Sequence, residues 1–440
     1  MIYNRLIVAA IGFIRLEPYD GKLSRTVLRG GKDSNALLLP DYASVEMMLN
    51  PALRGKAVAV CGATEERHGI VLAKSEAAKK VGVKTGMVNW EAKQLCPDLI
   101  MVPPHYEQYL KYSKLARAIY QRYTDQVEPY GMDECWLDIT GSQRICGNGM
   151  EAAEDIRRTM KQELGLTVSI GVSYNKIFAK LGSDMKKPDA ITEITKENFK
   201  EKVWPLPASD LLYVGRATTA KLARYGIYTI GDIAAANPDF LHGILGVNGL
   251  AIWKYATGRD DSRVMHKDFV SPVKSVGHGI TCYADLETPE EVWKVILELS
   301  QDIGHKLRLH ELSATGVQIS IRGNDLGSRQ FQAKLSHSTQ TPIVIARKAR
   351  DLFELNYSWA TPVRAVCVRA INLVPQGQPE QIDLFTDVSY LDRLNKLDLA
   401  IEEIRRRFGK RAVYSACLMG DLKMPGDGRE LVVMPGMMGR

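Results

Sequence analysis

Apolar residues in the N-terminal half of the chain follow the spacings of alternating helices and strands. Between 106 and 123, apolar and aromatic residues recur every three or four positions, which predicts an amphipathic helix. Residues 127–139 are rich in strand formers, and residues 168–172 predict another strand after a helix over 150–164. The pattern therefore predicts an alternating α/β domain.

The pattern changes at about residue 205. Short helical segments separated by glycines follow as far as Gly258, which is typical of a small all-helical unit. A polar linker spans 263–274, and residues 275–385 then alternate helices and strands as a separate α/β module. The tail after about Gly420 is rich in Gly, Met and Pro and is expected to be disordered. The fold class is therefore expected to be α/β and multidomain.

Composition and charge narrow the class of protein. A chain of 440 residues exceeds what one hydrophobic core usually serves, and 45% hydrophobic with 25% charged residues is ordinary for a soluble globular protein. The apolar run Leu6 to Ile14 is too short to span a bilayer, and no small-residue cleavage pattern follows it. The 7 cysteines form no C-x-x-C pair, which argues against disulfides and zinc and favours the cytoplasm. A net charge of +7 permits a polyanionic partner without establishing one.

The stretch 130–138, YGMDECWLD, carries two adjacent acids inside an apolar strand pattern. Burying them is costly unless a positive group compensates, and a divalent cation would do so. In an ideal strand Asp133 and Glu134 would face opposite sides, so both reach one site only near a turn, for which Gly131 is suitably placed. From this stretch alone, the simpler interpretation is that the two acids lie at the tip of a hairpin and have no catalytic role.

Lysines further along the chain make a catalytic role for the two acids more plausible than the acids alone would. Residues 169–188, SIGVSYNKIFAKLGSDMKKP, place several of them after a strand and along a helix. Singly, each lysine is more often a solvated surface charge. Phosphoryl transfer, however, needs acidic residues that bind a metal ion next to lysines that bind phosphate, and the two stretches together supply both.

Five motifs together resemble a Y-family translesion DNA polymerase of the DinB or polymerase IV type. They occur in family order between about 36 and 385: YASVE at 42–46, NPALRGKAVAV at 50–60, AKKVGVKTGM at 78–87, YGMDECWLD, and SIGVSYNKIFAKLGSDMKKP. The resemblance implies a right-hand polymerase with a palm, fingers, a helical thumb and an α/β little-finger domain.

The resemblance also implies domain boundaries. The expected domains are the palm at 36–46 and 105–203, fingers at 47–104, thumb at 204–262, linker at 263–274 and little finger at 275–388. Residues 1–35 match nothing in the family and are expected to be an N-terminal extension. Residues 389–440 are expected to form a C-terminal helix and a flexible tail.

The resemblance implies site residues for two-metal nucleotidyl transfer. Asp133 resembles a metal ligand, and Glu134 resembles the second acid at the primer 3′ hydroxyl, with two Mg²⁺ ions between them and the nucleotide. Lys187 matches a lysine that contacts the triphosphate, and Lys79 stands where many relatives have an arginine for the same task. Tyr42 resembles the aromatic residue that blocks a ribose 2′ hydroxyl.

One position departs from the family pattern. In family members the N-terminal strand carries an aspartate that binds both metals, and in register this chain has Leu37 there. Asp33 and Asp41 lie four residues to either side, and a shift of four residues along a strand moves a side chain about 13 Å. Neither can take the place of that aspartate without local rebuilding, so the resemblance leaves catalytic competence open.

DNA contacts are expected in the thumb and little finger. Residues 211–231 resemble a helix-hairpin-helix unit, in which backbone amides near Gly215 and Arg216 would hold a DNA phosphate. A purely structural helical hairpin is the alternative. Arg322, Arg329 and Lys334 would add backbone contacts from the little finger.

Residues 381–385, QIDLF, resemble a sliding-clamp-binding peptide. Gln381, Leu384 and Phe385 would enter a pocket of the clamp as an extended segment. A final strand of the little finger is the alternative.

Together these residues predict a DNA polymerase of low fidelity that extends a primer opposite damaged template. It would use primer–template DNA, dNTPs and Mg²⁺, bind the clamp, act as a monomer and need no membrane. The competing hypothesis is a non-catalytic DNA- and clamp-binding relative that recruits other repair factors.

Overall fold

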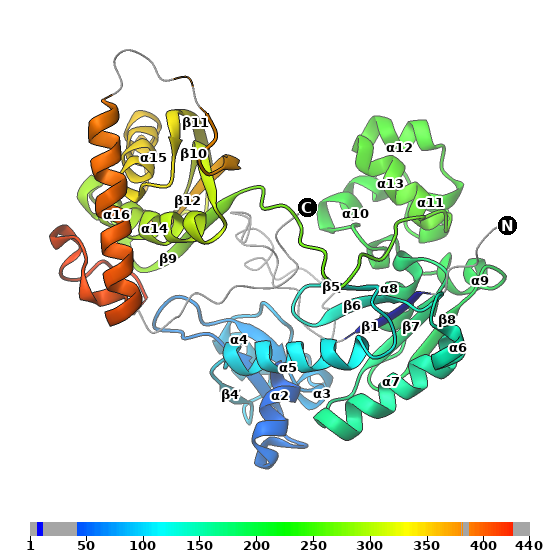
Figure 1. Cartoon of the computed structure of the whole chain (residues 1–440). Coiled ribbons are helices and arrows are strands. Elements are labelled where there is room, and N and C mark those ends of the chain that lie inside the picture. The colour runs from blue at the N-terminus through cyan, green and yellow to red at the C-terminus, as the bar shows by residue number, and fades with distance from the viewer. Residues whose placement is uncertain (1–6, 12–41, 380, 382–386, 426–440) are drawn as a thin grey trace.

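The computed structural model describes residues 7–11, 42–379, 381 and 387–425 (Figure 1). Within these residues the strands form three sheets, ordered β5-β6-β1-β7-β8, β3-β2-β4 and β11-β10-β12-β9. A group of short helices without a sheet lies apart from all three in Figure 1. The α/β multidomain class predicted from the sequence is therefore confirmed.

The five-stranded sheet belongs to the palm. Its strands are β5 (Val127–Tyr130), β6 (Glu134–Asp138), β1 (Ile7–Ile11), β7 (Ser169–Ser173) and β8 (Ile191–Ile194). β1 is the central strand and runs antiparallel to both neighbours, with Ile11 opposite Glu134 of β6 and opposite Ser169 of β7. Residues 1–35 are predicted to be an N-terminal extension outside the palm. In the structure, residues 7–11 instead form the central strand of this sheet. The physical reason is that an uninterrupted apolar run suits a central strand with helices over both faces of its sheet.

Helices cover both faces of this sheet. The palm helices are α5 (Tyr106–Tyr120), α6 (Gln143–Cys146), α7 (Gly149–Leu164) and α8 (Lys176–Met185). Cys135 and Leu137 of β6 share a core with α7, whereas Trp136 packs with Ala179 of α8. Strand alternation therefore places Glu134 on the α8 face with Trp136.

Gly171 lets α8 lie directly on the sheet. A Cβ at this position would come within 1.8 Å of the Ala179 carbonyl oxygen, so only glycine permits the approach. The N-terminus of α8 is capped by Asn175, whose side chain accepts a hydrogen bond from the Phe178 amide at 2.8 Å. The helix that carries Lys180 is thereby fixed against β7.

The fingers contain the three-stranded sheet. Their elements are α2 (Tyr42–Leu49), η1 (Pro51–Leu53), β2 (Val58–Cys61), β3 (Val71–Lys74), α3 (Glu76–Lys80), α4 (Asn89–Leu95) and β4 (Ile100–Val102). β2 is central, antiparallel to β3 and parallel to β4. An ion pair between Arg67 and Asp285 joins the fingers to the little finger.

The predicted helical unit is confirmed. It contains η2 (Ala208–Asp210), α10 (Arg216–Ala223), α11 (Ile230–Ala235), α12 (Pro238–Leu245) and α13 (Val247–Ala256), and α9 (Phe199–Val203) leads into it from the expected palm segment. Leu222, Ile233, Leu241 and Ile252 form its core together with Phe178 of α8. The thumb therefore packs on the same palm helix that lies against β7.

The little finger is a four-stranded antiparallel sheet covered by helices. It comprises β9 (Val276–Leu286), α14 (Pro289–Leu309), β10 (Leu312–Gly323), β11 (Ser328–Thr339), α15 (Pro342–Asn356) and β12 (Val363–Pro375). The C-terminal elements α16 (Val388–Phe408), η3 (Lys410–Ala412) and η4 (Ala416–Leu418) follow. Leu418 is buried in the little-finger core, with Leu422 and Met424 packed beside it, so the tail expected to be disordered is docked as far as residue 425.

Among the described residues, no helix combines the length and the apolar character needed to cross a membrane.

Candidate active site

The β5–β6 hairpin presents Asp133 and Glu134 at its tip. Gly131 adopts φ +83° in the turn, a conformation that glycine adopts without strain, and Glu134 begins β6. The Met132 carbonyl accepts a hydrogen bond from the Ser113 hydroxyl of α5 and holds the turn against the palm. Asp133 and Glu134 are 3% and 4% exposed, so the sequence places two carboxylates in a nearly dry position.

The two carboxyl groups differ in their partners, because Glu134 is paired with Lys180 whereas Asp133 has no hydrogen-bond donor among the described residues. Lys180 Nζ lies 3.1 Å from Glu134 Oε1 as an ion pair. Burial raises the pKa of Asp133 well above its usual range, and the charge of Glu134 raises it further. Burial also raises the pKa of Glu134, while Lys180 opposes that shift.

This environment fits a divalent cation. Mg²⁺ is bound through one or two carboxylates plus substrate phosphates and water, rather than by a cage made only of protein. In the parts of the chain that the structure describes, no three His, Cys, Asp or Glu residues are grouped to hold a metal by themselves. Asp133 and Glu134 are therefore two carboxylates that could bind such a cation if a ligand supplied further oxygens.

The strand beside these acids contributes no carboxylate. β1 reads Ile-Val-Ala-Ala-Ile, and its last residue lies opposite Glu134. Leu37, Asp33 and Asp41 are outside the described residues. None of the five residues of β1 is therefore a carboxylate that could lie beside Glu134.

A row of charged groups continues from Glu134 through Lys180 and Asp184 of α8 to Lys187, two residues beyond the end of this helix. Lys180 Nζ lies 2.8 Å from Asp184 Oδ2, and Lys187 Nζ lies 2.7 Å from Asp184 Oδ1. Sequence reasoning named Lys187 but missed Asp184. The signal was present as the spacings i, i+4 and i+3 from Lys180 through Asp184 to Lys187.

Another nearby lysine has a structural role. The ammonium of Lys176 lies 2.7 Å from Glu128 Oε1 and 4.4 Å from the ring centroid of Trp136. It joins β5 to α8 and leaves Lys180 as the ammonium nearest Glu134.

Tyr42 lies next to the acid hairpin. It begins α2, is 0% exposed and stacks on Tyr109 with ring centroids 4.0 Å apart. Met132, the residue before Asp133, packs in the same cluster. The Tyr109 hydroxyl donates to Glu46 at 2.5 Å, which fixes the ring that Tyr42 stacks on.

Lys79 lies apart from the palm lysines. It is on α3 of the fingers, its side chain is 40% exposed, and its Nζ is 3.6 Å from Glu76 Oε1.

The predicted DNA-contacting residues of the thumb lie at the start of α10. Gly215 is the N-cap of α10, Arg216 is its first residue, and both are exposed. Tyr213 adopts φ +71°, a conformation that glycine usually supplies. This position is where the family resemblance implies a first glycine.

The little-finger residues fall on two faces. Side chains alternate between the two faces of a strand, and Ile319 and Ile321 of β10 point into the core. Arg322 of β10 and Lys334 of β11, which pairs with Gly316, therefore lie on the opposite face of the sheet. Arg329 pairs with Ile321 and so belongs to the other face, where it is exposed on the edge strand β11. Register therefore separates Arg329 from the other two.

Of the three residues predicted to bind a clamp, Gln381 is exposed, and Leu384 and Phe385 lie outside the described residues.

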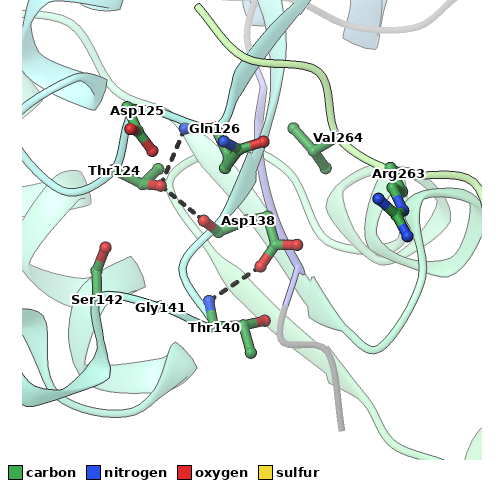
Figure 2. A pocket seen from close by; sticks show the side chains of 9 residues that line it. All are labelled: Thr124, Asp125, Gln126, Asp138, Thr140, Gly141, Ser142, Arg263 and Val264. Carbon is green, nitrogen blue, oxygen red and sulfur yellow. Dashed lines mark hydrogen bonds between the residues drawn. The ribbon is translucent and has the colours of Figure 1, made fainter. Parts of the chain in front are cut away.

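A pocket of about 380 Å³ lies at the far end of β6 (Figure 2). Thr124, Gln126, Asp138, Thr140 and Arg263 are among its lining residues. Asp138 ends the strand that Glu134 begins, which puts them about 13 Å apart. The Asp138 carboxylate already accepts a hydrogen bond from the Thr140 amide at 2.9 Å. No residue predicted for the active site lines this pocket.

Two family models match the chain. Residues 41–184 match the impB/mucB/samB family, and residues 273–384 match the C-terminal domain of that family. The first match covers the fingers and most of the palm, and the second covers most of the little finger.

Whole-chain relatives agree with these matches. The DNA polymerase IV of Acetivibrio thermocellus is 48% identical over 380 residues, which is 86% of this chain and 95% of the relative. The DNA polymerase IV of Moorella thermoacetica is 35% identical over 376 residues, covering 85% of this chain and 93% of the relative.

Solved structures of the same fold are more distant in sequence. A Y-family DNA polymerase chimera of Dbh and Dpo4 matches with a TM-score of 0.68 and 24% identity, covering 84% of this chain and 100% of the other. The insertion ternary complex of Dbh DNA polymerase matches with a TM-score of 0.53 and 22% identity over the same shares. The chain belongs to the impB/mucB/samB family and, within it, to the Y-family DNA polymerases of the DNA polymerase IV type.

Proposed function

We propose that this protein is a template-directed DNA polymerase of low fidelity that extends primers opposite damaged template. The carrying observation is the pair of adjacent buried carboxyl groups, Asp133 and Glu134. Asp133 has no hydrogen-bond donor among the described residues, and Glu134 lies beside Lys180. The relatives named DNA polymerase IV and the neighbour described as an insertion ternary complex support the same reaction.

Asp133 and Glu134 would hold two Mg²⁺ ions together with oxygens of the nucleotide. Bound there, the metal ions would lower the pKa of the primer 3′ hydroxyl and balance the charge of the triphosphate. Lys187 donates to triphosphate oxygens from the palm, and Lys79 reaches them from the fingers. Tyr42, fixed by its stack on Tyr109, restricts the space at the sugar.

The residues of β1 favour a second candidate function. Because β1 carries no carboxylate and Leu37 replaces the expected aspartate, the palm holds one ligand fewer than the family pattern. A protein of this fold that binds DNA and the clamp without catalysis is therefore the alternative. Single-nucleotide primer extension separates the two, since both bind DNA.

Shortening Tyr42 to alanine is expected to admit ribonucleotides. The substitution removes the ring that stacks on Tyr109, so the ratio of ribonucleotide to deoxynucleotide incorporation should rise by at least about tenfold. The measurement is primer extension with paired rNTP and dNTP series. Tyr106→Ala is the matched control, because Tyr106 meets Tyr42 only edge-on at 5.9 Å. An active Tyr42→Ala protein with an unchanged ratio would contradict the role of Tyr42.

Alanine at both Gln381 and Phe385 is expected to abolish clamp binding. The two residues are the polar and aromatic anchors of an extended peptide, so their loss should leave no measurable affinity for the sliding clamp in surface plasmon resonance. Extension of short primers without clamp should be unchanged. Gln378→Ala is the control, since Gln378 is exposed in the same loop. Equal clamp affinity for the double variant and the control would overturn the clamp-binding role.

A further inference from the structure

Three ion pairs in series connect the second acid of the palm to the triphosphate lysine. They run from Glu134 to Lys180 at 3.1 Å, from Lys180 to Asp184 at 2.8 Å, and from Asp184 to Lys187 at 2.7 Å. The side chains of Lys180 and Lys187 are 3% and 9% exposed, so little water screens the row. Asp184 is the central member, because each of its two oxygens holds a different lysine.

Lys187 needs such a partner to present its charge. A lysine side chain has about 2 kcal/mol of rotamer entropy, and a contact that limits its freedom prepares it for a ligand. Burial lowers the pKa of Lys187 and the charge of Lys180 lowers it further, whereas Asp184 raises it. Asp184 therefore both orients the ammonium and favours its charged form.

Holding Lys187 does not block a phosphate. An ammonium group has three donors, so one can remain on Asp184 Oδ1 while the others point to triphosphate oxygens. Competition between Asp184 and the triphosphate is the opposite possibility, and it predicts tighter nucleotide binding when Asp184 is neutralised. Burial argues against competition, because without Asp184 two ammonium groups would face each other with little solvent.

We propose that Asp184 is a positioning residue for the incoming nucleotide, which holds Lys187 toward the triphosphate and Lys180 toward Glu134. The inference rests on the proposed function, since it requires a dNTP that contacts Lys187. It adds a residue that touches neither metal nor nucleotide and acts through two lysines.

The test is dNTP affinity measured without chemistry. The full-length chain is bound to primer–template DNA with a 3′-dideoxy primer, and dATP is titrated in Mg²⁺ opposite a template thymine. Asp184→Asn should weaken dATP binding about tenfold with unchanged DNA affinity. Asp184→Glu, which keeps the charge, should recover most of the loss. Glu154→Gln is the matched control, because Glu154 is an exposed palm carboxylate paired with Arg157 at 2.7 Å.

A double variant separates positioning from a general loss of structure. If Asp184 acts through Lys187, then Asp184→Asn combined with Lys187→Ala should bind dATP no more weakly than Lys187→Ala alone. Additive losses, or dATP affinity of Asp184→Asn that equals or exceeds that of the unmodified chain, would overturn the inference. If the proposed function itself is wrong, the unmodified chain will bind no dATP on this DNA. That result differs from the ones above, and it would also overturn the inference.

Discussion

Replacing Glu134 with alanine is expected to lower single-nucleotide primer extension by at least about 1000-fold, which corresponds to about 4 kcal/mol of transition-state stabilisation. Glu134 is 4% exposed, and its partner among the described residues is the Lys180 ammonium, 3.1 Å from Oε1. The carboxylate is therefore held beside Asp133, where the proposed function has it bind a metal ion. Binding to primer–template DNA should persist, because the DNA contacts proposed for the thumb and little finger are unchanged. The measurement is the extension rate at saturating dNTP and Mg²⁺.

Two further variants serve as controls for this prediction. Glu193→Ala removes an exposed glutamate from β8 of the same sheet and should extend primers at the normal rate. Glu134→Gln keeps the shape of the side chain and should be as inactive as Glu134→Ala, with a normal unfolding temperature. A rate within tenfold of the unmodified chain for either Glu134 variant would exclude Glu134 from catalysis.

Placing an aspartate on β1 is expected to raise the extension rate by at least about tenfold. The Ile11→Asp substitution introduces a carboxylate opposite Glu134, and residues directly opposite each other in antiparallel strands have Cβ atoms about 4.5–5.5 Å apart. A third oxygen ligand beside Asp133 and Glu134 would complete the metal site. The same primer-extension assay measures the gain.

Two other aspartates make this result specific. Ala10→Asp places the carboxylate opposite Cys135, which lies in the apolar core against α7, so it should destabilise the fold and give no gain. Leu37→Asp tests the register that the sequence motif implies. A gain from Leu37→Asp but not from Ile11→Asp would show that the missing carboxylate belongs at position 37, as the family motif implies.

The sequence predicted the fold and the hairpin acids well because both depend on local patterns. The spacing of apolar residues predicted the alternating helices and strands, and the frequent glycines predicted the short helices of the helical unit. The order of the sequence motifs identified Asp133 and Glu134 next to the Gly131 turn. These features need no knowledge of which strands pair.

The central strand and the ion-pair row could not be predicted in the same way. Pairing of β1 with β6 joins residues more than a hundred positions apart, and an apolar run alone does not tell which sheet it enters. Asp184 was passed over because a carboxylate between lysines on a helix normally forms a solvated surface pair. Its significance depends on burial of Lys180 and Lys187, which only packing against the sheet reveals.

The most direct test of the central claim is whether the unmodified chain adds one complementary nucleotide to a primer in Mg²⁺. The account predicts a primer lengthened by one nucleotide chosen by the template, lost on chelation of Mg²⁺ and lost in Glu134→Ala. A chain that binds primer–template DNA at low salt yet never lengthens the primer would contradict it. If Ile11→Asp or Leu37→Asp then gained extension, the protein would be a binding factor of polymerase fold that lacks one ligand.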